Sequence, residues 1–180
     1  EQYVVALDKA TGDTIWRTDR TVDYDDIDPA TGKPDREGDW RKAYSTPIVV
    51  NIDGVETLIS LGSMALYGYA VDTGEELWRV EFVGSHSGAC RPVVFEDLIL
   101  IPTGSGAELW AIRPTGGGVL DDSHIAWKYD KAVPRRPSPL VYDGMVFMVD
   151  DSGVAACVDA RSGSEIWRKR VGGNFSASPI

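Results

Sequence analysis

The sequence repeats one short pattern: an apolar strand, an aspartate, a turn that contains glycine, and a tryptophan. The pattern reads "ALDKATGDTIW" at 6–16, "AVDTGEELW" at 70–78 and "CVDARSGSEIW" at 157–167, and a looser copy, "AIRPTGGGVLDDSHIAW", runs from 111 to 127. A second marker, a proline that enters an apolar run, recurs at Pro47, Pro92, Pro139 and Pro179. These prolines are 45, 47 and 40 residues apart. The chain therefore consists of repeated units of about forty residues.

Each unit has the pattern of β-strands throughout. Residues 139–168 show it best, because four runs rich in Val, Ile, Phe and Trp alternate with Asp-Gly and Ser-Gly turns. No window has a sustained helical apolar period, which excludes a helical solenoid, and a β-sandwich does not require the same markers in the same register. Four-stranded units of this length predict an all-β fold, a β-propeller of four-stranded antiparallel blades.

The two markers predict a single partial propeller domain of about three and a half blades. We expect the end of a blade at 1–22, an acidic insertion at 23–42, whole blades at 43–82, 88–130 and 135–171, and the start of the next blade at 174–180. Because closed rings typically have about 4 to 8 blades, the remaining blades are expected from the same longer chain or from another copy. The longer chain is favoured, since open blade faces would expose large apolar patches. Residue 1 leads directly into strand-like sequence without a signal peptide, which indicates a processed or truncated chain.

The charge and the cysteines limit the classes of partner. A net charge of −10 argues against general binding to nucleic acid or to anionic membranes, because both reward an excess of Lys and Arg. No apolar run reaches the roughly 18 residues that span a bilayer, so no membrane insertion is expected. Cys90 and Cys157 lie far apart in unlike contexts, and we expect small core residues or free thiols.

The first junction between units contains a long acidic insertion. Thirty residues separate Trp16 from Pro47, against 13, 11 and 11 at the later junctions, and residues 21–40 contain seven acids and two bases. Asp23, Asp25 and Asp28 supply oxygen ligands that suit Ca²⁺, but the spacing is not that of an EF-hand. The favoured interpretation is a solvated surface loop. Its length also makes it a candidate partner-binding loop.

The segments before the marker prolines form the candidate site. First strands of blades run beside the central channel, so these segments are expected around one mouth of the ring. The candidate residues there are Lys42, His86, Arg91, Arg135, Arg136 and Asn174, with Tyr44 and Phe175 beside them. Guanidinium groups at such a mouth could hold a carboxylate or phosphate, which predicts a protein or a small anionic ligand as partner. The competing hypothesis is that these arginines pair with Asp or Glu of neighbouring blades.

Other motifs favour no catalytic centre. His86 and His124 lie in different units and lack the further ligands that a zinc site needs. The stretch "GSHSG" carries His where a nucleophile elbow has Ser, and no helix follows the Gly-rich turns at 103–106 and 115–118 to receive a phosphate. No catalytic, cofactor-binding or metal-binding residue is assigned, and the sequence favours a non-enzymatic role.

The repeated motif resembles the tryptophan-docking repeat of pyrroloquinoline quinone (PQQ)-type propellers over essentially the whole chain. The first copy matches at Ala6, Asp8, Gly12 and Trp16, and the second at Ala70, Asp72, Gly74 and Trp78 after a shortening of the turn. The last copy matches at Asp159, Gly163 and Trp167, while the third has Arg113 in place of the aspartate and extra residues between Gly116 and Trp127. In such repeats each indole is expected to pack over the next blade, with its N–H available to a backbone carbonyl.

The resemblance sets the functional expectations. This superfamily includes quinoprotein dehydrogenases, a lipoprotein that scaffolds outer-membrane barrel assembly, and exported bacterial proteins of unassigned role, which the chain resembles most. The dehydrogenases stack PQQ on a vicinal disulfide and bind Ca²⁺ through Glu, Asn and Asp. Neither Cys90 nor Cys157 neighbours another cysteine, and no such ligand set can be assigned, so PQQ with Ca²⁺ is implied only by the resemblance.

From these observations we expect a non-enzymatic propeller that serves as a rigid protein- or ligand-binding platform, in the periplasm or outside the cell. Two alternatives stay open. The first is a quinoprotein-type oxidoreductase whose PQQ and Ca²⁺ site lies mostly outside these 180 residues. The second is a carbohydrate- or polymer-binding module.

Overall fold

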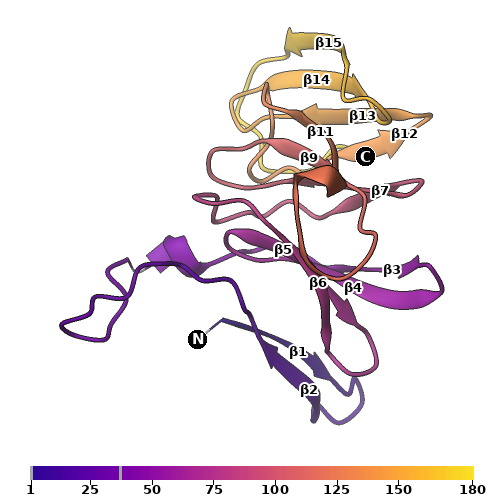
Figure 1. Ribbon diagram of the computed structural model, residues 1–180. Helices are drawn as coiled ribbons and strands as arrows, with labels where there is room; N and C mark the ends of the chain where they lie inside the picture. Colours follow the sequence, from indigo (N-terminus) through magenta and orange to yellow (C-terminus); the bar gives the residue numbers. More distant parts are fainter. Residues whose placement is uncertain (1, 37) are drawn as a thin grey trace.

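The structure, a computed structural model, describes residues 2–36 and 38–180. It is all-β, with four sheets, antiparallel except for one added strand, stacked face to face in an open series (Figure 1). The first sheet is the hairpin β1 (Tyr3–Leu7) and β2 (Thr14–Asp19). The predicted fold class, a partial β-propeller, is confirmed.

The other three sheets are whole blades, each with its strands in chain order from the inner to the outer edge. The second contains β3 (Ile48–Ile52), β4 (Val55–Leu61), β5 (Ala65–Ala70) and β6 (Glu76–Glu81). The third contains β7 (Val93–Phe95), β8 (Leu98–Pro102), β9 (Leu109–Ile112) and β11 (Ile125–Tyr129). The fourth contains β12 (Leu140–Tyr142), β13 (Met145–Val149), β14 (Val154–Asp159) and β15 (Glu165–Arg170).

Two single-turn 3-10 helices complete the secondary structure of the described ranges, at Gly38–Arg41 and Asp122–His124. Neither is long or apolar enough to cross a bilayer. Residues 174–180 form no strand, but the Ser138 N–H donates to the Ser178 hydroxyl oxygen at 2.9 Å, so this segment lies beside the fourth sheet. The predicted blade boundaries remain a sequence-based division.

The core lies between the sheets rather than inside any one of them. Strand β8 shows why, because all five of its residues are buried. Successive side chains of a strand point to opposite faces, so Ile99 and Ile101 pack against the second sheet while Leu98 and Leu100 pack against the fourth. A middle blade therefore requires apolar residues on both faces, and its strands lose the alternation of polar and apolar residues.

The extra residues of the third unit form a strand that the sequence pattern did not predict. Strand β10 (Gly118–Leu120) pairs in parallel with β6 of the preceding blade, with Gly118 opposite Trp78 and Leu120 opposite Val80. The Leu120 side chain is buried in the core between the second and third sheets. Strand β10 therefore extends the outer edge of the second blade and links the third blade to it.

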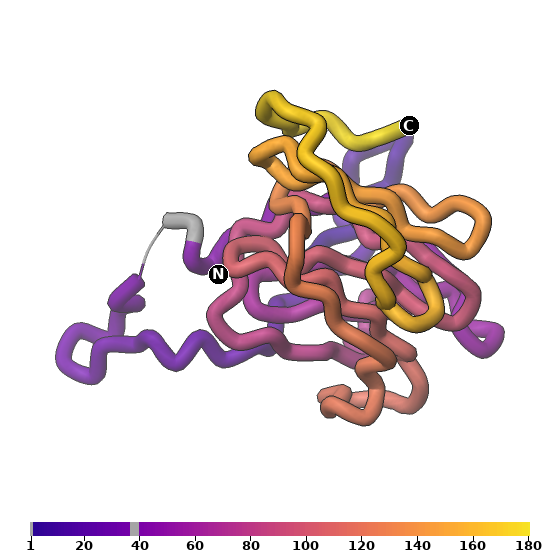
Figure 2. The backbone as a smooth tube through the Cα atoms, turned by 90° about the horizontal axis from the view of Figure 1, so that it is seen from above, coloured from indigo at the N-terminus to yellow at the C-terminus, as the bar shows by residue number. Residues whose placement is uncertain are grey.

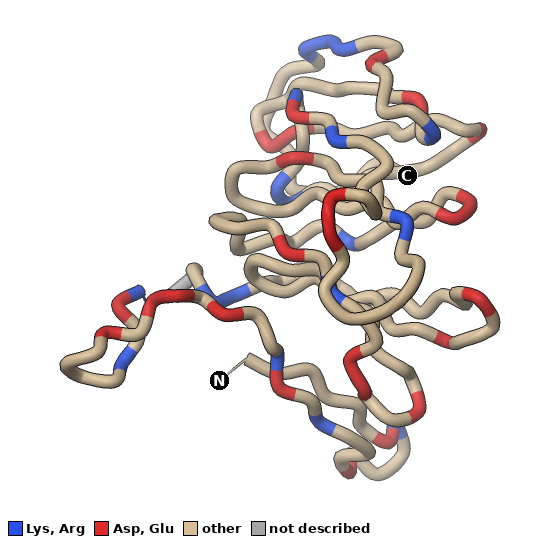
Figure 3. The backbone as a smooth tube through the Cα atoms, viewed as in Figure 1, with Lys and Arg blue, Asp and Glu red and all other residues tan. Residues whose placement is uncertain are grey.

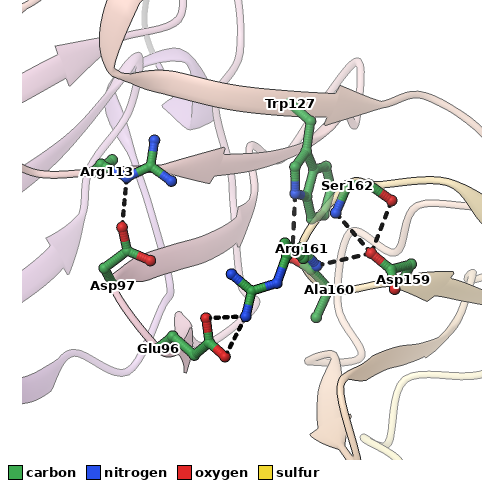
Figure 4. A network of polar contacts seen from close by, with 8 residues as sticks. All are labelled: Glu96, Asp97, Arg113, Trp127, Asp159, Ala160, Arg161 and Ser162. Atoms are coloured by element: carbon green, nitrogen blue, oxygen red, sulfur yellow. Dashed lines mark hydrogen bonds and ion pairs between the residues drawn. The ribbon is translucent and has the colours of Figure 1, made fainter.

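Two tryptophans of the repeat reach across to the next sheet. The Trp16 indole N–H donates to the Val71 carbonyl at 2.8 Å, and the Trp127 N–H donates to the Ala160 carbonyl at 3.2 Å (Figure 4). A Cβ added to Gly74 would lie 2.4 Å from the Trp16 ring, and one added to Gly163 would lie 2.5 Å from the Trp127 ring. Each indole ring thus lies directly on the backbone of a glycine, where the side chain of any other residue would clash with the ring.

The remaining two tryptophans are placed differently. Trp78 is buried and lies over Gly68 of its own sheet, where an added Cβ would meet the ring at 2.3 Å. Trp167 lies on β15, the outermost strand of the last sheet, and 43% of its surface is exposed. The four copies of one motif therefore have three different environments, because the neighbouring sheet differs in each case.

Replacing Gly163 by Ala tests the indole contact. Gly144, in the β12–β13 turn, is a matched control, since its φ of +72° is close to the +70° of Gly163 but nothing lies within 4 Å of an added Cβ. Both changes should cost about 1 kcal/mol of left-handed strain. Gly163→Ala should lose about 2 kcal/mol more, because the added methyl overpacks against Trp127. Urea unfolding of both variants measures the difference, and equal losses would contradict the contact.

Candidate functional site

The segments that precede the marker prolines lie side by side, joined by hydrogen bonds. The Tyr44 N–H donates to the Gly88 carbonyl at 2.8 Å, and the Ser45 hydroxyl donates to the Cys90 carbonyl at 2.7 Å. The Arg91 N–H in turn donates to the Ser138 hydroxyl oxygen at 2.8 Å. A groove of about 540 Å³ runs along the adjacent first strands, lined mainly by β3, β7 and β12. These contacts make one continuous rim of segments that are more than forty residues apart in sequence.

Arg135, Arg136 and Asn174 gather at one part of this rim, around Asp151. The backbone N–H of Arg135 donates to Asp151 Oδ2 at 2.7 Å, and the side-chain Nε of Arg136 lies 3.5 Å from Asp151 Oδ1. The backbone N–H of Phe175 donates to the Asp151 carbonyl at 3.3 Å, which places Asn174 alongside. The adjoining groove, of about 420 Å³, is lined by Arg135, Arg136 and Asp151 together with Asp130 and Asp150. The Arg136 side chain therefore faces a carboxylate of its own unit, and the groove beside it carries both signs of charge.

Lys42 and His86 lie at another part of the rim. The Ser87 N–H donates to the Lys42 carbonyl at 2.9 Å, and His86 Nδ1 lies 2.8 Å from the Ser87 hydroxyl. The His86 ring packs against Trp40, with 5.2 Å between ring centroids. Arg91 is exposed and lines the groove between them and the Arg135 region. The six predicted residues thus share one rim in two groups, and their binding role stays a prediction.

The acidic insertion contacts the rim through His86 and the second sheet through Ser63, and a buried ion pair joins its two ends. The Asp26 carboxylate is buried and pairs with the Arg41 guanidinium, whose Nε lies 3.3 Å from Asp26 Oδ2. The Arg41 guanidinium also lies over the Tyr24 ring, 4.5 Å from its centroid. The Trp40 carbonyl accepts a hydrogen bond from the Ser63 hydroxyl. The sequence predicted a solvated surface loop. In the structure only the middle of the insertion is exposed to solvent, and its two ends are held by buried contacts.

The middle of the insertion projects away from the stacked sheets in two perpendicular views, and Asp and Glu follow its course (Figures 2 and 3). It forms a small hairpin in which Ile27 bridges to Pro34 and a turn begins at Asp28. The Ala30 N–H and the Thr31 hydroxyl bond to the Asp28 carboxylate and lower its pKa below the usual value. Sequence reasoning missed this turn, although "DPATGK" at 28–33 repeats "DKATGD" at 8–13.

The described residues do not fit the PQQ and Ca²⁺ site of quinoprotein dehydrogenases. Cys90 and Cys157 are buried free thiols in different parts of the chain, so they offer no vicinal disulfide. Burial raises the pKa of the Cys90 thiol to about 12, and its Sγ lies 3.2 Å from the Pro137 carbonyl oxygen. Within residues 2–36 and 38–180, no group of three or more His, Cys, Asp or Glu side chains is arranged to hold a metal ion.

Replacing Asp26 by Asn tests the anchoring of the insertion. The change leaves the partly buried Arg41 guanidinium without its charged partner, which should cost about 2 kcal/mol and loosen the hairpin. Asp25→Asn, at the exposed neighbouring position, is the matched control. Hydrogen exchange of the amides at 26–35 should become faster in Asp26→Asn alone. Equal exchange in the two variants would show that the ion pair does not hold the insertion.

Comparison with known proteins places this architecture in a family. A family model described as outer membrane protein assembly factor BamB, PQQ_2, matches residues 1–180. The assembly factor BamB of Shewanella oneidensis is 25% identical over 180 residues, which cover 94% of this chain and 40% of that protein. The BamB of Yersinia pestis is 23% identical over 184 residues, which cover 98% and 41%. The chain thus spans about two fifths of the length of these curated relatives.

Solved structures show the same fold. BamB from Moraxella catarrhalis has a TM-score of 0.56 at 18% identity, over 94% of this chain and 43% of that one. A europium-containing methanol dehydrogenase has a TM-score of 0.66 at 13% identity, over 99% and 41%. At these identities the likeness establishes architecture alone. With the family match over the whole sequence, it confirms the resemblance seen in the motifs: the chain belongs to the PQQ_2 family of outer membrane protein assembly factor BamB, within the PQQ-like repeat proteins.

Proposed function

We propose that the protein is a non-enzymatic, rigid platform that binds a partner protein in the bacterial envelope. The observation that carries the proposal is the rim, where segments of successive blades are joined by hydrogen bonds into one surface. Because these segments are bonded to one another and lead directly into packed sheets, little conformational freedom is lost when a partner binds, which favours affinity. The name of the two curated relatives, outer membrane protein assembly factor, supports both a protein partner and an envelope location.

The charges on the rim favour a protein over a small anion. A phosphate or carboxylate approaching Arg135 and Arg136 would also meet Asp151 and the neighbouring Asp130 and Asp150. A protein surface can present both signs of charge in a complementary order, which a small anion cannot. No observation on the described residues favours the oxidoreductase or the carbohydrate-binding alternative.

Photo-crosslinking from the rim tests the proposal. A benzophenone amino acid placed at Arg135 of the whole protein, in its native cells, should capture one discrete envelope protein. The same probe at Asp53, in the turn at the opposite end of β3, is the control and should capture much less. Equal capture from both positions, or a stoichiometric quinone spectrum after addition of PQQ and Ca²⁺, would contradict the proposal.

The captured partner then allows a quantitative measurement. Replacing Arg91, Arg135 and Arg136 by Ala should weaken its binding about tenfold at low salt, with a smaller effect at high salt, because exposed charges are screened. Arg17→Ala on β2, away from the rim, is the control. An unchanged dissociation constant in the triple variant would exclude these arginines from the interface.

A further inference from the structure

The turn at the tip of the insertion has the same backbone as the turns that receive tryptophans. In all four turns, at 8–13, 28–33, 70–75 and 159–164, the N–H of the glycine donates to the carbonyl four residues earlier, at 2.8–2.9 Å. In all four, the N–H of that earlier residue donates to the carbonyl of the residue after the glycine, at 2.8–2.9 Å. The insertion therefore carries a copy of the turn motif outside any blade.

Two of these turns show how an indole is bound. The Trp16 ring rests on Gly74 and donates its N–H to the Val71 carbonyl. The Trp127 ring rests on Gly163 and donates its N–H to the Ala160 carbonyl. In both cases the accepting carbonyl belongs to the residue three positions before the glycine. This turn geometry thus supplies two things at a fixed distance from each other: a glycine surface on which the ring lies, and a backbone carbonyl that accepts the indole N–H.

The turn in the insertion has both the glycine and the carbonyl, and no side chain covers its glycine. Gly32 has φ +66°, and apart from its own atoms and those of its two chain neighbours, no atom of the described residues lies within 4 Å of a Cβ built on it. The carbonyl three positions earlier is that of Pro29. The hairpin projects from the stacked sheets in both views (Figures 1 and 2), so the neighbouring blades do not cover this turn as they cover those at Gly74 and Gly163.

We propose that the hairpin 27–34 binds an exposed tryptophan of a partner protein, whose indole stacks on Gly32 and donates its N–H to the Pro29 carbonyl. The surplus of acids at 21–40 further favours a tryptophan flanked by Lys or Arg, through long-range attraction. This inference deepens the proposed function and rests on it, because a protein partner must supply the indole. It names a second contact point, separate from the arginines of the rim.

A photoreactive peptide tests this site without the partner. The probe is a five-residue peptide, Lys-Gly-X-Gly-Lys, in which X is a diazirine-bearing tryptophan, and labelled positions on the whole protein are mapped by mass spectrometry. Labels should accumulate at residues 28–33 at least fivefold above those from the same peptide with a diazirine-bearing leucine. The turns at 70–75 and 159–164, whose glycines are already covered, should stay at background.

Two changes show whether the label reports the predicted geometry. Gly32→Asn keeps a residue that tolerates the left-handed conformation but places a Cβ over the binding surface, so labelling at 28–33 should fall about tenfold. Gly54→Asn, in the open β3–β4 turn at φ +88°, is the matched control and should label as the parent does. A peptide with an N-methylated indole removes the donor without altering the protein and should label several-fold less.

The outcomes separate this inference from the proposed function. Labelling of 28–33 no higher than at the covered turns, or labelling that survives both Gly32→Asn and indole methylation, would overturn the inference while leaving crosslinking from the rim unaffected. Conversely, specific labelling of 28–33 together with no discrete capture from Arg135 would remove the rim as the partner-binding surface and leave the hairpin as the docking site.

Discussion

An indole resting on a bare glycine is the contact on which two of the junctions between neighbouring sheets depend. It requires a turn whose glycine has a positive φ, so that no side chain stands between the ring and the backbone, and a carbonyl placed to accept the indole N–H. Trp16 on Gly74 and Trp127 on Gly163 satisfy both conditions. These contacts join the first sheet to the second and the third to the fourth, while the hydrogen bonds of the rim join the second to the third and the third to the fourth. Between the indole contacts and the rim, the apolar side chains on the two faces of β8 pack against the second and the fourth sheet.

The third unit departs from the repeat and makes additional polar contacts, both within its own sheet and with its neighbours. In the third unit Arg113 stands where other copies have the motif aspartate, and its Nε lies 2.5 Å from Asp97 of the same sheet. The neighbouring Glu96 receives two hydrogen bonds from Arg161 of the next unit, at 2.5 Å each (Figure 4). Strand β10 adds a further tie, since it belongs to the third unit and pairs with the second. A middle blade is thus held on both sides by polar as well as apolar contacts.

The surfaces that we propose for partner binding lie outside these contacts. The rim gathers residues from three successive units at one end of the sheets, and the insertion extends from the same region through the packing of Trp40 on His86. An element that reaches a partner must be held in a defined direction, and the buried Asp26–Arg41 pair provides that support at the base of the hairpin. In the proposed function, the repeats supply rigidity, and the rim and the insertion supply recognition of the partner.

The sequence by itself determined the architecture. Strand periodicity, turn glycines and the recurrence of both markers are local properties, so they predicted four-stranded blades and an open series without knowledge of any contact. They could also have predicted the turn at 28–33, because its letters repeat those at 8–13. The placement of the six candidate residues on one rim followed from topology alone, since first strands share one edge.

Only the tertiary structure decided which side chains meet. The pairing of Asp26 with Arg41, the contact of Trp40 with His86 and the parallel strand β10 each join residues at least fifteen positions apart. The same motif placed Trp16 over the next sheet and Trp78 over its own, because the neighbouring surface and not the motif determines what an indole covers. Local patterns fix backbone conformation through sterics and hydrogen bonds between near neighbours. Ion pairs and ring contacts depend on how sheets pack, and that packing is known only when the whole chain is folded.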